Sequence, residues 1–278
     1  MLRILWFSSL GLAAVLLAVL GGFFFEARAM PIVRRAEVGL ADWPAGAPPA
    51  TVVLISDLHV GNLATDPGRL ARVVTRVDDL HPDLVLIAGD FLPGHRPLAA
   101  ERVARLLAPL SGLHARLGVL AVLGNHDHWA GEATIRPALE QVGVTLLSNQ
   151  AVQRGPLAIG GVDDPVTDHS QTRTVIRALY GLPGARIVMA HSPEIVDELP
   201  PDLPLLLAGH THCGQIRLPL IDPHGPSWPY SRYECGVVHD PGRTTIVTAG
   251  LGTSVLPLRF GAPPDVWLLT LGPQARRR

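Results

Sequence analysis

The sequence predicts an α/β fold in which short buried strands alternate with helices. Short apolar runs that contain β-branched residues and end in turn signals are typical of buried strands. Such runs cover residues 52–55, 84–88, 119–123, 187–190, 205–208 and 245–248. Between the first two, residues 67–80 carry apolar side chains at helical spacing, with Pro67 at an acceptable first position. This alternation favours a sheet covered by helices.

The N-terminal segment differs in composition from the rest of the chain. Residues 4–25 contain no charged side chain, and a helix that rises about 1.5 Å per residue over this length spans a hydrocarbon core of about 30 Å. We therefore expect a single-pass membrane anchor over residues 1–25. A cleaved signal peptide is the alternative, because Ala27-Arg28-Ala29 resembles a cleavage site. Basic residues nearly balance on the two sides of the span, so the side of the membrane on which the rest of the chain lies stays undecided.

The remaining chain is long enough for one sizeable domain. Residues 26–49 are expected to be a linker because they end in a Pro-rich run, residues 50–272 to be the globular domain, and residues 273–278 to be a basic tail. A net charge of -1 argues against a nucleic-acid binder with a broad basic face. No obligate protein partner is evident.

The chain has two cysteines, Cys213 and Cys235, which are too few for a disulfide framework. Cys213 lies within the run from Gly209 to Gln215, which also contains two candidate metal ligands. A disulfide there would compete with metal binding, so we expect free thiols.

Side chains that can bind metals follow five of the predicted strands. They are Asp57, His59, Asp90, Asn125, His191, His210 and His212. Ligand sites in α/β sheets gather at the carboxyl ends of strands, so we expect these side chains to meet at one edge. Asp57 and His59 are two residues apart, so on an extended stretch both would face the same way.

The mixed oxygen and nitrogen donors predict the kind of metal. They suit Mn, Fe, Zn or Ni more than Ca, with Mn favoured, and the lack of a cysteine cluster disfavours structural zinc. Seven ligands exceed the needs of one ion. With one carboxylate shared, they suit two divalent ions about 3.5–4 Å apart, which clamp a phosphoryl group and activate a bridging water. The set therefore predicts a binuclear phosphoesterase.

The order of these motifs resembles the calcineurin-like metallophosphoesterase superfamily, whose pattern is D-x-H, G-D, G-N-H-[DE], H and G-H-T-H. The resemblance covers roughly residues 50–272 and implies a four-layer sandwich of two β-sheets flanked by helices. It also implies attack by a metal-bridging hydroxide and a division of the ligands between the ions. One ion would bind Asp57, His59, Asp90 and His212; the other would bind Asp90, Asn125, His191 and His210, with Asp90 bridging.

The resemblance further implies that His126 protonates the leaving group and that Asp127 orients it. The sequence is compatible with this role, because an adjacent carboxylate can raise the pKa of a histidine and keep it a proton donor. A ligand role is the alternative, since Asn125 and His126 would point apart on an extended chain. Arg259 is a tentative substrate contact, because its forked donors suit a phosphate, and a surface ion pair is its alternative.

A closer resemblance is to membrane-anchored bacterial members, through residues 56–61, the extension at 213–215 and the tail at 256–265. Some of these members are UDP-2,3-diacylglucosamine pyrophosphatases of lipid A synthesis, and others are general phosphodiesterases. The resemblance implies hydrolysis of a phosphorylated lipid or nucleotide-linked lipid at a bacterial inner membrane. The alternatives are a phosphomonoesterase and a non-catalytic, membrane-tethered metal-binding module. We expect loops such as residues 222–235 to govern substrate preference.

Overall fold

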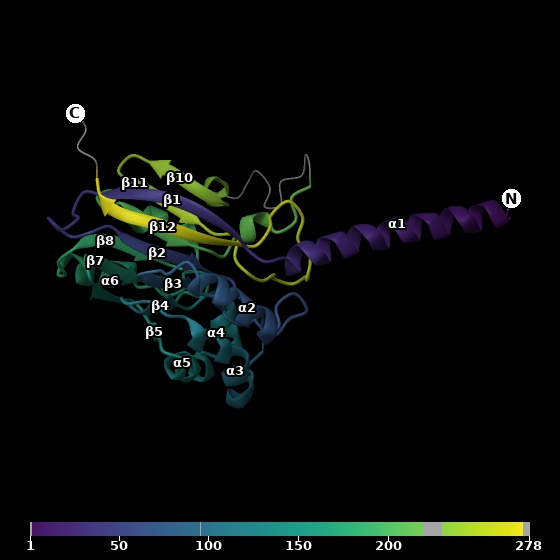
Figure 1. Cartoon of the computed structure of the whole chain (residues 1–278), viewed down its shortest axis with the longest axis horizontal. Coiled ribbons are helices and arrows are strands. Elements are labelled where there is room, and N and C mark those ends of the chain that lie inside the picture. The colour runs from purple at the N-terminus through teal and green to yellow at the C-terminus, as the bar shows by residue number, and fades with distance from the viewer. Residues whose placement is uncertain (1, 95, 219–229, 275–278) are drawn as a thin grey trace.

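The computed structural model describes residues 2–94, 96–218 and 230–274, with side chains from residue 11 onward (Figure 1). The helices are α1 (Leu2–Arg28), α2 (Pro67–Asp78), α3 (Ala100–Leu107), α4 (Asn125–Ala130), α5 (Glu132–Gln141) and α6 (Thr172–Tyr180). The strands are β1 (Ile32–Leu40), β2 (Ala50–Ile55), β3 (Leu84–Ala88), β4 (Val119–Val122), β5 (Val144–Leu146), β6 (Gln150–Arg154), β7 (Leu157–Gly161), β8 (Ala185–Met189), β9 (Leu205–Ala208), β10 (Gly236–Asp240), β11 (Arg243–Val247) and β12 (Asp265–Pro273).

The strands form two six-stranded sheets. The first has the order β1-β12-β2-β3-β4-β5 and the second the order β10-β11-β9-β8-β7-β6. Within the first, β2 to β5 run parallel; within the second, β7, β8, β9 and β11 run parallel. All six strands predicted from the apolar runs are present, with boundaries that differ by two residues at most.

Three apolar cores bind these sheets and helices into four layers. Along β2, Val53 packs toward α2, α3 and α5, whereas Leu54 packs between the two sheets. On the far side, Val188 of β8 packs against Val175 of α6. Strands buried on both faces read as continuous apolar runs, which is why they were predictable. The expected four-layer sandwich is confirmed.

Helix α2 shows how the sequence determines an element that frames the site. The side chain of Asp66 caps its first turn by accepting a hydrogen bond from the Arg69 amide at 2.9 Å. Pro67 occupies the first helical position, and Leu70 and Val73 are buried in the core. The predicted helix is therefore confirmed, and it ends two residues earlier than expected.

The predicted linker over residues 26–49 is wrong. Residues 32–40 form β1, which pairs in parallel with β12 from Ile32 opposite Asp265 to Leu40 opposite Pro273. The folded unit therefore begins well before residue 50. The strand escaped notice because it lies at the edge of the sheet, where charged side chains such as Glu37 can alternate with partly buried ones.

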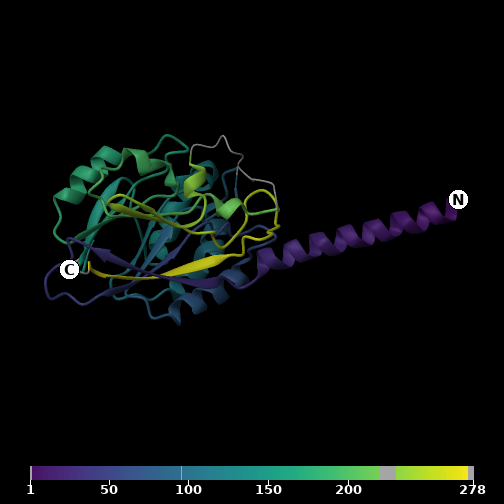
Figure 2. The same ribbon diagram turned by 90° about the horizontal axis from the view of Figure 1, so that it is seen from above.

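Helix α1 projects from one end of the domain, as Figures 1 and 2 show. Residues 11–28 are long and apolar enough to cross a membrane by length and composition. At the other end of the chain, β12 extends to Pro273. Most of the predicted basic tail, residues 275–278, lies outside the described residues.

Candidate metal centre

The seven predicted ligands meet at one edge of the two sheets. Each follows the carboxyl end of a strand: β2, β3 and β4 in the first sheet, and β8 and β9 in the second. Six of the seven are at least 95% buried, namely Asp57, His59, Asp90, Asn125, His191 and His212. The structure thus brings together every residue that was expected to bind metal.

One group of donors contains Asp57, His59 and His212. The Nε2 atoms of the two histidines lie 3.2 Å apart. Nε2 of His212 lies 3.4 Å from Oδ1 of Asp57. All three ligand atoms lie within 4.8 Å of one another, which is compact enough to surround one ion.

A second group contains Asn125, His191 and His210. Nε2 of His191 lies 3.1 Å from Oδ1 of Asn125 and 3.2 Å from Nδ1 of His210. The donors therefore converge on a second point, which draws on both sheets.

Asp90 lies between the two groups. Its Oδ2 atom is 3.5 Å from Nε2 of His59 and 3.3 Å from Nε2 of His191. Its other oxygen accepts a hydrogen bond from the His126 amide at 2.9 Å, which fixes the carboxylate in place. This is the position that a shared ligand requires.

Unusual backbone conformations deliver these side chains. Five ligands have positive φ: Asp57, His59, Asp90, His210 and His212. Such conformations cost non-glycine residues about 1–3 kcal/mol each and cluster at functional sites. Asp57 and His59 therefore reach the same point through left-handed turns, and the extended stretch expected for them is wrong.

Two glycines next to ligands allow the loops to approach closely. A Cβ atom on Gly124 would lie 2.3 Å from Oδ1 of Asp90, and one on Gly209 would lie 2.5 Å from Oδ2 of Asp57. No side chain fits there, which explains why a glycine precedes both Asn125 and His210.

The electrostatics of the site suit bound cations. Burial lowers the pKa of His59 to about 4 and that of His212 well below its usual value, so both imidazoles are neutral at pH 7, as metal ligands must be. Burial also raises the pKa of Asp57 to about 6, while His191 lowers it and Asp90 raises it to smaller extents. A cation would relieve the cost of two buried carboxylates so close together.

One buried atom in particular has the properties of a metal ligand. Oδ1 of Asp57 is buried and has no hydrogen-bond partner among the described residues, whereas Oδ2 accepts hydrogen bonds from the Ser56 hydroxyl and the His210 amide. Buried polar atoms are otherwise nearly always satisfied. This atom and the converging oxygen and nitrogen donors fit divalent ions.

His126 lies beside this centre on the first turn of α4, not on the extended chain that was expected. Its ring contacts those of His59 and Trp129 edge to face, with centroids 4.8 and 5.0 Å away. Its Nε2 atom lies 3.4 Å from the hydroxyl of Ser254. A donor atom of His126 also falls within 4.8 Å of donors of His59 and Asp90, so its position suits a proton donor beside the ligands as well as the alternative ligand role.

Asp127 has a different task from the expected one of orienting His126. Its Oδ1 accepts hydrogen bonds from the amides of Phe91 and Leu92, and its Oδ2 accepts one from the amide of Gly124. The carboxylate thus ties the loop after β3 to the loop after β4. It positions Asp90 and Asn125 rather than the imidazole.

Arg259 is fully buried, and neither expected role matches its surroundings. Its guanidinium donates hydrogen bonds to the carbonyls of Ala249, Gly252 and Ala262 at 2.6 to 3.0 Å. These bonds occupy the forked donors that were expected to bind a phosphate. Arg259 therefore supports the loop after β11, and it forms neither a surface ion pair nor an available substrate contact.

The contribution of the loop after β11 to the site was not predicted from the sequence. A strand was predicted there, but no chemistry was assigned to its end. The loop supplies Ser254 beside His126, and a Cβ on Gly250 would lie 2.5 Å from that of Asp57. The sequence did offer one signal for this contribution: the loop follows a parallel strand, and ligand sites gather at the carboxyl ends of such strands.

The predicted free thiols are wrong, because Cys213 and Cys235 form a disulfide with Cα atoms 4.7 Å apart. Cys213 packs against Ala249 and Ala262, while Nε2 of the adjacent His212 still lies 3.4 Å from Oδ1 of Asp57. The bridge therefore does not compete with metal binding. The segment it joins was expected to influence substrate preference, although residues 222–229 lie outside the described part.

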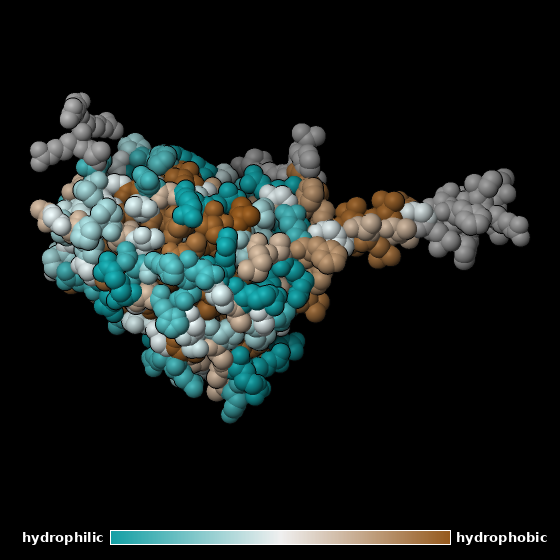
Figure 3. Space-filling view, viewed as in Figure 1, coloured by the Kyte–Doolittle hydropathy of each residue, from teal (hydrophilic) through white to brown (hydrophobic). Residues whose placement is uncertain are grey.

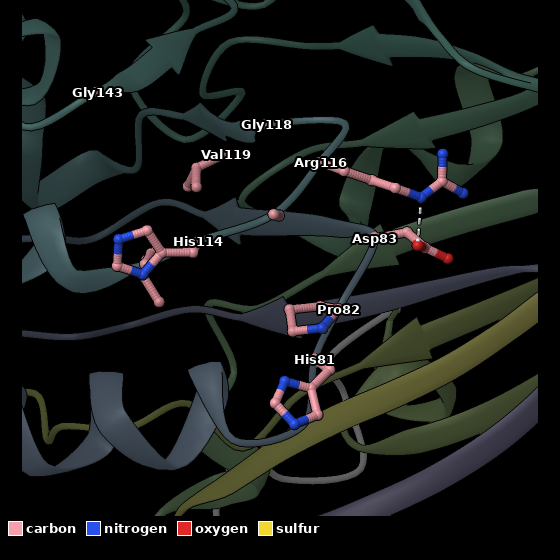
Figure 4. Close-up of a pocket in the computed structure, with 10 residues that line it drawn as sticks. His81, Pro82, Asp83, His114, Arg116, Gly118, Val119 and Gly143 are labelled. Carbon is pink, nitrogen blue, oxygen red and sulfur yellow. Dashed lines mark hydrogen bonds and ion pairs between the residues drawn. The ribbon is translucent and has the colours of Figure 1, made fainter.

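Two hollows lie on different ends of the domain. One of about 350 Å3 opens beside the ligands and is lined by residues that include His210, His212 and Ser254. The other, of about 580 Å3, lies where β3 and β4 begin, and there Asp83 pairs with Arg116 (Figure 4). The second lies at the opposite end of these strands from the ligands, so only the first can serve the metal centre.

The chain matches one family model and is similar to three proteins described below. The sequence model described as calcineurin-like phosphoesterase matches residues 50–214. The chain is 30% identical over 268 residues to an uncharacterized metallophosphoesterase of Helicobacter pylori, across 93% of this chain and 69% of that protein. It is 31% identical over 238 residues to the uncharacterized protein YpbG of Bacillus subtilis, across 82% and 84%. It is 28% identical over 282 residues to a transmembrane protein with metallophosphoesterase domain of Danio rerio, across 94% and 62%.

Proposed function

The chain belongs to the calcineurin-like phosphoesterase family of phosphoester hydrolases, and on that premise we propose a phosphodiesterase or pyrophosphatase that acts on a phosphorylated lipid or a nucleotide-linked lipid. UDP-2,3-diacylglucosamine is one such substrate. The position of Asp90 between the two donor groups carries the proposal, because it allows two ions to share one carboxylate.

The residues present would hold the two ions in distinct groups. Asp57, His59 and His212 would bind one, Asn125, His191 and His210 the other, and Asp90 both. Mn is the favoured metal, because the donors mix oxygen and nitrogen. Two bound ions would neutralise the charge of the phosphoryl group and lower the pKa of a water molecule.

His126 is proposed as the proton donor to the leaving oxygen. Its ring lies at the border between the ligands and the hollow, where Ser254 is 3.4 Å away. A leaving group of high pKa needs such a donor, which contributes about 10²–10⁴-fold to typical rates.

Membrane anchoring is the second part of the proposal. Leu12, Val15, Leu16 and Leu17 of α1 are each more than half exposed, so the helix presents apolar side chains to its surroundings. Cleavage near Ala29 would cut the chain where it is packed, since Ala27 is fully buried and Arg69 donates to the carbonyl of Ala29 at 2.8 Å. These contacts favour a retained anchor in a bacterial inner membrane over a signal peptide.

The disulfide between Cys213 and Cys235 indicates on which side of that membrane the catalytic domain lies. Disulfides persist in oxidising compartments such as the bacterial periplasm and are rare in the cytosol. We therefore place the catalytic domain on the outer face. This favours a phosphorylated lipid over UDP-2,3-diacylglucosamine as the substrate, because nucleotide-linked lipids are made from cytosolic nucleotides. A reporter enzyme fused to the C-terminus tests this, because alkaline phosphatase activity supports the outer face and cytosolic reporter activity contradicts it.

The function is tested with the full chain in lipid nanodiscs, loaded with Mn and assayed on matched substrates. We expect hydrolysis of bis(p-nitrophenyl) phosphate and of a lipid phosphodiester, and little hydrolysis of p-nitrophenyl phosphate. Preference for the monoester would indicate a phosphatase. Two bound metals without hydrolysis of any substrate would indicate a non-catalytic module. Asp90→Asn serves as the inactive control.

A further inference from the structure

The last turns of α1 are fixed to the catalytic domain. The ring of Phe23 stacks on that of Phe260 with centroids 4.6 Å apart, and the amide of Arg259 donates to the carbonyl of Phe23 at 3.0 Å. Ala27 is fully buried. The helix therefore leaves the domain in one defined direction.

This attachment lies on the same edge as the metal centre. Arg69 donates to the carbonyl of Ala29 and, through Nη1, to that of Leu251, both at 2.8 Å. Leu251 belongs to the loop after β11 that borders the ligands. One buried side chain thus joins the end of α1 to the loop beside the metal centre.

Three apolar side chains protrude from this edge, and we call Leu63, Val255 and Leu256 the apolar rim. Leu63 is 71% exposed, Val255 89% and Leu256 51%. Figure 3 shows apolar atoms along α1 and on the edge of the domain beside its base. Single exposed apolar residues are ordinary, but a group beside an apolar helix marks an interaction surface.

The apolar rim is held in place by hydrogen bonds. Asn62 donates to the carbonyl of Thr253 at 2.9 Å, and the amide of Ser254 donates to Oε1 of Gln215 at 2.8 Å. Arg28 donates to the carbonyl of Leu63 and pairs with Asp66 at 2.9 Å. The exposed side chains are therefore presented by ordered loops.

The hollow of about 350 Å3 connects the apolar rim to the ligands. Its lining includes the exposed Val255 and Leu256 of the rim together with His210, His212 and Ser254 of the metal centre and its border. A ligand that occupies it would contact apolar side chains at one end and the metal centre at the other.

We propose that the apolar rim inserts into the same bilayer that holds α1, so that a membrane-resident lipid reaches the metal centre without leaving the membrane. The inference rests on the proposed function and specifies its substrate as a lipid with a phosphoester at headgroup depth. Because α1 is docked at the rim, a helix that crosses the bilayer holds the rim at the bilayer surface. Arg28, beside Leu63, can keep its charge at the headgroup layer.

Photocrosslinking tests the contact without relying on turnover. The full chain carries p-benzoylphenylalanine in place of Val255, or of Leu63 in a second variant, and is irradiated in nanodiscs of phosphatidylethanolamine and phosphatidylglycerol. The matched control carries it in place of Tyr180, which is 40% exposed and precedes β8, at the opposite end of that strand from the ligands. Mass spectrometry identifies the adducts.

We expect lipid adducts at positions 255 and 63 in several-fold higher yield than at position 180. Equal yields at the three positions would overturn the proposal. Crosslinks from position 255 to a second copy or to another protein, in place of lipid, would also overturn it. Crosslinking does not depend on hydrolysis, so the two proposals can be told apart. Absence of lipid adducts with normal diester hydrolysis would contradict only the membrane contact. Lipid adducts without diester hydrolysis would contradict only the proposed function.

Discussion

The guanidinium of Arg259 lies with Nη2 3.3 Å from Nδ1 of His212. Both hydrogens of Nη2 are directed at carbonyls, those of Ala249 and Gly252 at 2.6 Å each, so this contact positions the ring by packing. It leaves Nε2 of His212 facing Asp57. Such outer contacts commonly fix the orientation of metal-binding histidines.

Replacing Arg259 with Lys should therefore destabilise the protein. Lysine keeps the charge but cannot reach the same carbonyls in fork geometry, and each buried carbonyl left unpaired costs about 1–3 kcal/mol. We expect a loss of at least about 2 kcal/mol in the free energy of unfolding, measured by denaturant titration. Arg116→Lys, at an exposed ion pair, is the control. Unchanged stability with a raised KM would instead indicate a substrate contact.

Asp90→Asn should remove metal from both positions. The amide keeps the shape of the carboxylate but loses the charge that two ions would share. We expect metal content, measured by mass spectrometry, to fall at both sites and activity to fall by more than about 100-fold. Asp83→Asn, far from the ligands, should retain both metals. Full activity in Asp90→Asn would rule out the shared-ligand interpretation.

His126→Gln should slow turnover without removing metal. Loss of a proton donor lowers kcat by about 10²–10⁴-fold for a leaving group of high pKa. The decrease should be smaller for p-nitrophenolate, which needs no protonation. The role of His126 as a proton donor is measured by comparing kcat for a substrate with a leaving group of high pKa and for a p-nitrophenyl substrate, at equal metal content. Loss of one metal would instead support the ligand alternative.

Removal of the disulfide should weaken both the fold and the turn that carries His212. A 22-residue separation between the cysteines corresponds to about 3 kcal/mol in the chain-entropy model. Cys213→Ser combined with Cys235→Ser should lower the free energy of unfolding by about that amount. Reductant should destabilise the wild type and leave the double variant unaffected, which is the control. A wild type indifferent to reductant would contradict the bridge.

The pair of His128 and Asp163 should contribute stability over a limited pH range. Nε2 of His128 lies 2.8 Å from Oδ1 of Asp163. Burial opposes charge on both groups, but their attraction prevails, so the pKa of His128 is raised and that of Asp163 is lowered.

The contribution of His128 to the free energy of unfolding is complete below its unfolded pKa of about 6.5 and is lost as the pH rises through its folded pKa. The contribution of Asp163 is complete above its unfolded pKa of about 3.9 and is lost as the pH falls through its folded pKa. His128→Gln should therefore lower Tm most between about pH 4 and 6.5 and least near pH 9. His114→Gln, at an exposed histidine, is the control. A Tm difference independent of pH would exclude the charged pair.

Six of the twelve described strands, together with the ligand residues, were predictable from the sequence because both carry local signals. Strands buried on both faces appear as apolar runs, and ligands such as Asp90 follow them directly. What escaped depends on contacts between distant segments. Asp127 binds amides 35 and 36 positions away, Arg259 binds a loop that the sequence does not mark, and Cys213 meets Cys235 only because the fold brings them together. The edge strand β1 carries charges that concealed it.

The short connection from α1 to β1 limits how the enzyme meets its substrate. Only Ala29 to Pro31 separate the helix from a strand that is locked into the sheet. With α1 in a bilayer, the catalytic edge cannot swing away to search the surrounding solution, as it could on a flexible tether. Encounter then becomes a lateral search in two dimensions, so turnover should depend on the surface density of substrate in the membrane rather than on its bulk concentration.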